Sequence, residues 1–88
     1  MKSIVVCGAG GFIGGHLVAD LVRRGHRVRA VDVKPLAAWH QRFEQVENLR
    51  LDLRRLDACR VAVEGMERVY NLAADMGGMG FKIGRAHV

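Results

Sequence analysis

The sequence predicts an α/β fold built on a parallel β-sheet, and three observations support this prediction. Four short runs rich in apolar residues, at 4–7, 27–32, 49–51 and 69–74, alternate with segments of helical periodicity. A glycine or an aspartate stands at or just after the end of each run. Half of the residues are hydrophobic, which is typical of a globular chain. Strands that alternate with helices indicate a parallel sheet with right-handed crossovers.

The first helix is expected between Gly11 and Gly25, where the second glycine is a good helix stop. Its apolar face is formed by Phe12, Ile13, Leu17, Val18, Leu21 and Val22. Its polar face carries His16, Asp20, Arg23 and Arg24.

The second half of the chain repeats the alternation. Pro35 breaks the chain after the strand at 27–32. Residues 36–47 are ambiguous and are consistent with one short helix carrying Trp39 and Phe43. A further helix is expected at 56–64, with Gly65 as its stop, before the last strand at 69–74.

The most specific signal joins the first strand to the first helix: Gly8-Ala9-Gly10-Gly11-Phe12-Ile13-Gly14. Gly8 permits a tight turn, Gly11 lets the backbone approach a pyrophosphate, and Gly14 lets the helix pack closely on the strand. The helix N-terminus would hold the diphosphate without a side-chain cation. Any tight strand-to-helix turn favours glycine, but the flanks also fit. The segment predicts a dinucleotide site in a Rossmann-type, doubly wound sheet, with cofactor contacts at Gly8, Gly10, Gly11, Phe12, Ile13 and Gly14.

Asp32 supplies the carboxylate that such a site needs. It ends the second strand about 20 residues beyond the glycines, where it would accept hydrogen bonds from an adenosine ribose. Its charge would repel a 2′-phosphate, which favours NAD over NADP, although Arg29 and Lys34 could partly offset that repulsion. The alternative is that Asp32 only ends a strand in a turn.

Composition excludes several other functions. The chain has 88 residues, fewer than an ordinary domain, with a formal net charge of +5 and a pI near 10.0. Its basic residues are dispersed and not interleaved with aromatic residues. They therefore indicate solvated faces and helix ends, and no nucleic-acid partner is expected.

The two cysteines, Cys7 and Cys59, lie far apart without the spacing of a metal site or a disulfide framework. We expect both to pack as small apolar residues, and we expect His16 and His26 at the surface, with no metal bound. The first strand begins almost at Met1, and no apolar run has the length of a membrane span. These features predict a cytoplasmic protein without a membrane partner.

A resemblance to a known family rests on Gly8, Gly11, Gly14, Asp32, Asp52-Leu53 and Asn71-Leu72-Ala73-Ala74. The pattern is similar to that of the extended short-chain dehydrogenase/reductases, the nucleotide-sugar epimerases and dehydratases. The resemblance implies that Asp52 hydrogen-bonds the adenine amine, that Ala73 and Ala74 line the nicotinamide side, and that Leu53 and Leu72 also bind the cofactor. It also implies NAD as cofactor, a nucleotide-sugar substrate and a homodimeric parent enzyme. From the residues alone, Asp52 is a solvent-exposed carboxylate in a turn.

A narrower resemblance covers residues 71–81, which are similar to a segment characteristic of the GDP-mannose 3,5-epimerases, a group within that family. It implies that Gly77, Gly78 and Met79 contact a GDP-hexose, in an enzyme that works by transient oxidation at C4. The alternative for this segment is a mobile glycine loop without specificity. For the whole protein, the alternatives are another sugar-nucleotide 4-epimerase or 4,6-dehydratase, or a non-catalytic NAD-binding regulator.

No catalytic residue is expected within this chain. The family's active-site serine or cysteine and its Tyr-x-x-x-Lys pair lie beyond the fourth strand, and Tyr70, the only tyrosine, has Ala74 where that pair has lysine. The resemblance covers residues 1–81, interpreted as the N-terminal fragment of an NAD-binding domain, an incomplete domain of about four strands. Residues 82–88 are expected to be a non-native tail, because 83–88 match a translated sequencing adapter. The alternative is a genuine basic tail.

Overall fold

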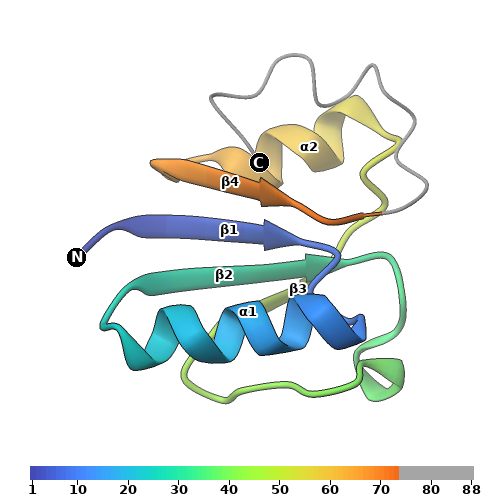
Figure 1. Ribbon diagram of the computed structural model, residues 1–88. Helices are drawn as coiled ribbons and strands as arrows, with labels where there is room; N and C mark the ends of the chain where they lie inside the picture. Colours follow the sequence, from blue (N-terminus) through green and yellow to red (C-terminus); the bar gives the residue numbers. More distant parts are fainter. Residues whose placement is uncertain (74–88) are drawn as a thin grey trace.

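The structure, a computed structural model, describes residues 1–73 (Figure 1). In this part the elements are β1 (Ser3–Cys7), α1 (Phe12–Arg23), β2 (Arg27–Asp32), the 3₁₀ turn η1 (Leu36–Ala38), β3 (Glu47–Arg50), α2 (Leu56–Val63) and β4 (Arg68–Asn71). The strands form one parallel sheet with the order β3-β2-β1-β4. The predicted α/β class and parallel sheet are confirmed.

The strand order reverses beside β1. The chain moves outward from β1 to β2 and β3, and then places β4 on the other side of β1. In this register Val5 lies between Arg29 of β2 and Val69 of β4. Where the order of a parallel sheet reverses, the carboxyl ends of the strands leave a crevice in which ligands bind. The segments after β1 and β4 therefore border the expected site.

The two helices cover opposite faces of the sheet (Figure 1). Because successive strand residues point to opposite sides, Ile4 and Val6 pack with the α1 residues Val18 and Leu21. On the other face, the cluster contains Val5, Cys7, Val31, Val69, Leu53, Cys59, Ala62 and Met66. Both thiols are buried as predicted, and burial raises the pKa of Cys7 to about 12 and that of Cys59 above its usual range.

Arg29 differs from the expectation that the basic residues are solvated, because its side chain is only 12% exposed. Its Nη1 donates to the carbonyl oxygens at the end of α2, those of Val61, Ala62 and Glu64, at 3.0, 2.9 and 2.8 Å. Its Nε donates to Glu47 at 2.8 Å. Arg29 thus satisfies helix-end carbonyls that α2 itself leaves unpaired.

The predicted limits of the third and fourth strands are wrong. The sequence predicts the third strand at 49–51, but β3 begins at Glu47, where the ion pair with Arg29 fixes the edge, and ends at Arg50. It predicts that the fourth continues to residue 74, but β4 ends at Asn71. The Asn71 side chain accepts the Ala73 N–H at 3.2 Å, which forms a local turn directly after β4.

In residues 36–47 the only helical segment is the 3₁₀ turn η1, there is no α-helix, and Glu47 already belongs to β3. Trp39 leaves that turn in an extended conformation, and its buried ring joins the α1-side core. In α1, Phe12 and Ile13 do not belong to the buried face, since they are 61% and 70% exposed. The buried residues of α1 are instead Gly14, Gly15, Val18 and Leu21. Neither α-helix of residues 1–73 has the length and apolarity needed to cross a bilayer.

Candidate dinucleotide site

A cavity of about 490 Å³ opens at the carboxyl ends of the strands. Its walls come from the segments that follow β1, β2, β3 and β4, which the parallel sheet brings to one edge. Seven of the predicted site residues line it: Gly8, Gly11, Asp32, Asp52, Leu53, Leu72 and Ala73. The structure thus brings these residues to one rim, where Gly8, Asp32 and Asp52 were expected because each stands at or just after a strand end, and the binding roles of all seven stay predictions.

The glycine turn is packed so tightly that an added Cβ would be too close to its neighbours at Gly8, Gly10 and Gly14, and at Gly8 and Gly14 these neighbours are backbone atoms. Gly8 has φ +88°, and a Cβ there would lie 2.8 Å from the Ala73 nitrogen. A Cβ on Gly14 would collide with the Gly8 carbonyl oxygen and lie 2.9 Å from the Ala9 Cα. These contacts set α1 directly against the turn, as expected for Gly14.

Gly11 is different, because no neighbour in the described chain requires it to be glycine. A Cβ on Gly11 would meet only the Gly8 oxygen at 3.6 Å, an ordinary van der Waals distance, and its φ of −82° suits any residue. Gly11 is also the N-cap of α1 and lines the cavity. No side chain caps the helix, and its first turn carries no acidic residue. The positive end of the helix therefore faces the cavity without a counter-charge from the helix itself.

Asp32 is the one charged residue that is buried within residues 1–73, at 8% exposure. Its Oδ2 accepts the Gly10 N–H at 2.9 Å and its Oδ1 accepts the Lys34 N–H at 3.0 Å. An ionised carboxylate has about four acceptor positions, so two remain for a ligand in the cavity that Asp32 lines. This arrangement suits a pair of ribose hydroxyl donors.

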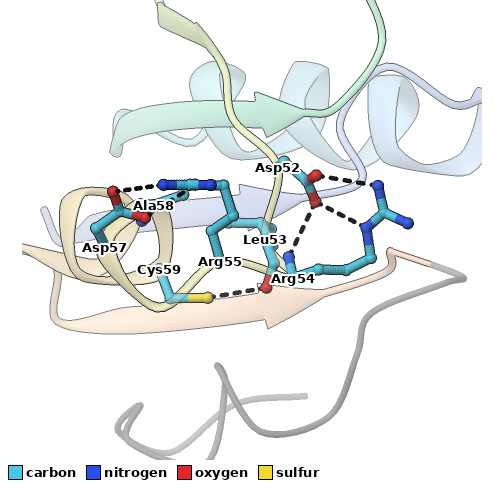
Figure 2. A network of polar contacts seen from close by, with 7 residues as sticks. All are labelled: Asp52, Leu53, Arg54, Arg55, Asp57, Ala58 and Cys59. Atoms are coloured by element: carbon cyan, nitrogen blue, oxygen red, sulfur yellow. Dashed lines mark hydrogen bonds and ion pairs between the residues drawn. The ribbon is translucent and has the colours of Figure 1, made fainter.

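Asp52 is held by its neighbour Arg54 (Figure 2). The guanidinium donates from Nε to Oδ1 and from Nη2 to Oδ2, both at 3.0 Å, and the Arg54 N–H donates to Oδ1 at 3.1 Å. The Arg54 side-chain bonds lower the pKa of Asp52 to about 2, so it is a carboxylate at neutral pH. Such a group only accepts hydrogen bonds, as recognition of an exocyclic amine requires.

Leu53 is held in place by contacts with α2 and the core beside it. The Cys59 Sγ donates to the Leu53 carbonyl oxygen at 3.0 Å, while the Leu53 side chain is buried in the α2-side core (Figure 2). On the opposite wall, the Leu72 N–H donates to the Cys7 oxygen at 2.7 Å, which ties the segment after β4 to the end of β1. Both walls are thus anchored to the sheet.

Several predicted contacts do not line the cavity. Gly10 packs against Trp39 and Asp32, Gly14 packs against the Gly8 carbonyl, and Phe12 and Ile13 are exposed outside the cavity. The Phe12 ring instead makes edge contacts with His16 and His40, at centroid distances of 4.6 and 4.9 Å. The predicted contacts Ala74, Gly77, Gly78 and Met79, with the strand-end residue Asp75, lie outside the described residues.

Sequence reasoning missed part of the wall, which includes Val33, Leu51 and Arg54, and it considered Lys34 only as a nearby cation. Their positions in the sequence could have identified them, because each of these residues lies at or within three residues of a predicted strand end. Among residues 1–73, no group of three or more His, Cys, Asp or Glu side chains could hold a metal ion.

Comparison with known proteins agrees with this geometry. The chain matches the model of the NAD dependent epimerase/dehydratase family over residues 4–87. GDP-mannose 3,5-epimerase 1 of Oryza sativa subsp. japonica is 40% identical over 84 residues, covering 89% of this chain and 21% of that protein. A 3 beta-hydroxysteroid dehydrogenase/Delta 5-->4-isomerase of Mycobacterium tuberculosis (strain CDC 1551 / Oshkosh) is 39% identical over 72 residues, covering 81% of this chain and 19% of that protein.

Among solved structures, UDP-glucose 4-epimerase of Thermus thermophilus, in complex with NAD, matches with a TM-score of 0.70 and 32% identity. This match covers 83% of the present chain and 24% of that one. It confirms the Rossmann-type fold expected from the sequence. The chain spans about a fifth of the length of the curated relatives it matches.

Proposed function

Since the chain belongs to the NAD-dependent epimerase/dehydratase family, we propose that it is the NAD-binding portion of a nucleotide-sugar epimerase. The observation that carries the proposal is Gly11. Nothing in the described protein explains the missing side chain there, yet a Cβ would narrow the cavity at the uncapped end of α1. A pyrophosphate bound against this backbone explains the glycine and supplies the missing negative charge.

The other walls fit the rest of a dinucleotide. Asp32 would accept the adenosine ribose hydroxyls, and Asp52, kept ionised by Arg54, would accept the adenine amine. Leu53 would contact the base, and Leu72 and Ala73 would border the path toward the nicotinamide. Since Asp32 is buried and ionised groups of like charge repel, an adenosine 2′-phosphate is disfavoured and NAD is the proposed cofactor.

The proposed reaction is the 3,5-epimerisation of a GDP-hexose, as in the GDP-mannose 3,5-epimerases. Bound NAD would supply a reversible hydride acceptor for C4 of the sugar, which transiently makes the neighbouring C–H bonds acidic. The residues of this chain would bind and orient the cofactor, while acid–base groups would come from elsewhere in the whole protein. This chain alone would be inactive. Its homodimeric parent, its cytoplasmic location and the boundary at residue 81 stay predictions.

A sugar-nucleotide 4-epimerase is the second candidate, because the matched Thermus structure has that activity in its name and binds NAD through the same fold. Deuterium uptake separates the two reactions. Returning a hydride to C4 leaves solvent deuterium out of the sugar, whereas proton exchange at C3 and C5 introduces it.

The test uses the full-length protein with NAD and GDP-mannose in D₂O, followed by NMR of the recovered sugar nucleotide. Deuterium at both C3 and C5 supports the proposal. Epimerisation at C4 without deuterium uptake, with UDP-glucose as a parallel substrate, would replace it with the second candidate. Uptake at C5 accompanied by loss of water would indicate a 4,6-dehydratase, and NAD binding without turnover of either substrate would indicate a regulator.

A further inference from the structure

Trp39 closes a ring of hydrogen bonds around the carboxylate of Asp32. The Trp39 Nε1–H donates to the Lys34 carbonyl oxygen at 3.0 Å, and the Lys34 N–H donates to Asp32 Oδ1 at 3.0 Å. On the other side, the Gly10 N–H donates to Asp32 Oδ2 at 2.9 Å. The ring is completed by the His40 N–H, which donates to the Gly10 carbonyl oxygen at 2.9 Å.

The aromatic ring of Trp39 also packs against Gly10 of the glycine turn. A Cβ on Gly10 would lie 2.8 Å from Trp39 Cδ1 and 2.9 Å from Asp32 Oδ2, so both side chains pack against Gly10. Trp39 is buried at 8% exposure within the α1-side core, yet it does not line the cavity. Trp39 is linked to the Asp32 carboxylate through Lys34 and Gly10, on the side away from the cavity.

The ring of hydrogen bonds depends on the N–H group of the Trp39 indole. Residues 36–38 form only a single 3₁₀ turn, so the loop after β2 has little regular structure to hold it. Leu36 and Phe43 of this loop also pack on the core, but Trp39 is the side chain there that combines apolar burial with an N–H donor. Without that donor the Lys34 carbonyl loses its hydrogen bond, and the residue whose N–H contacts Asp32 loses its link to Trp39.

We infer that Trp39 is a positioning residue, which sets the orientation of the Asp32 carboxylate and thereby the recognition of the adenosine ribose. This inference rests on the proposed NAD site, and it adds a residue that neither touches the cofactor nor belongs to the glycine motif. It predicts that replacing Trp39 impairs recognition of the adenosine ribose more than it impairs binding of the rest of the cofactor.

The test measures the affinity of the full-length protein for NAD and for NAD lacking the adenosine 2′-hydroxyl. The ratio of the two dissociation constants isolates the contact with Asp32. In the wild type we expect NAD to bind about tenfold or more tightly than the deoxy analogue, as for a hydrogen bond to a charged group. In Trp39→Phe, which keeps an aromatic ring but removes the N–H, the ratio should fall toward one. Phe43→Leu is the matched control, because Phe43 packs on the same core outside the ring, and the ratio should be unchanged.

A double-mutant cycle with Asp32→Asn adds a second readout. If Trp39 acts through Asp32, the double variant binds NAD no more weakly than Asp32→Asn alone. Should Trp39→Phe fail to fold, Gly10→Ala perturbs the same contact from the other side and must also lower the ratio. An unchanged ratio in the folded variant, or additive losses in the cycle, would overturn the role of Trp39. A wild-type ratio near one, or no NAD binding, would instead overturn the proposed site.

Discussion

Gly8 and Ala73 meet backbone to backbone at the carboxyl ends of β1 and β4, where a Cβ on Gly8 would lie 2.8 Å from the Ala73 nitrogen. This contact leaves no side chain between the glycine turn and the segment after β4. The proposed pyrophosphate wall and the proposed nicotinamide wall are therefore one continuous backbone surface, located where the strand order reverses.

The first prediction concerns cofactor choice. Asp32→Asn keeps the shape of the side chain but removes the charge that would repel a 2′-phosphate. We expect NAD binding to weaken by about 1–3 kcal/mol, as for a lost hydrogen bond to a charged group, and discrimination against NADP to fall. Titration calorimetry with both cofactors measures this, with Asp20→Asn on α1 as the control. A wild-type preference for NADP would refute the assignment of Asp32.

The second prediction concerns Arg29 and stability. Arg29→Met keeps much of the stem but removes the donor for three carbonyl oxygens at the end of α2. We expect the free energy of unfolding to fall by about 1–3 kcal/mol, because these helix-end groups lose their partner. Arg27→Met, at an exposed position on the same strand, should change it by less than about 0.5 kcal/mol. Equal effects in denaturant titrations would show that the Arg29 contacts contribute nothing.

The third prediction concerns pH and Cys7. Burial raises the pKa of the Cys7 thiol from 9.0 to about 12, so the folded state holds this proton more tightly than the unfolded state. The free energy of unfolding should therefore be independent of this group below about pH 9 and decrease as the pH rises toward 12. In Cys7→Ala that part of the alkaline decrease should vanish. Identical pH profiles for the two proteins would contradict the assignment.

The strands with strong local signals were predictable from the sequence. The run 27–32 matches β2 to the residue, because an apolar run is bounded by Gly25 before it and by Pro35 after it. The ends of β3 and β4 were not, because they depend on an ion pair between Arg29 and Glu47 and on a turn made by the Asn71 side chain. Neither contact leaves a periodic trace in the sequence.

The same division holds for the site. Gly8, Asp32 and Asp52 could be placed at one rim, because parallel strands bring their carboxyl ends together. The restraint of Asp52 by Arg54, and of Asp32 by the loop that carries Trp39, could not, because both depend on loop conformation. A sequence motif identifies the residues that face a ligand more readily than those that hold them in place.

The central claim, that Gly11 is glycine because a pyrophosphate binds there, is tested most directly by Gly11→Ser. Serine is a favoured N-cap residue and fits the backbone of Gly11, so the melting temperature of the full-length protein should stay the same or rise. Its Cβ and hydroxyl would occupy the proposed phosphate position, and calorimetric titration should show NAD binding weakened about tenfold or more, a loss of about 1.4 kcal/mol. Gly14→Ser, which collides with the Gly8 carbonyl, should instead lower the melting temperature. Unchanged NAD affinity in a folded Gly11→Ser protein would contradict the account.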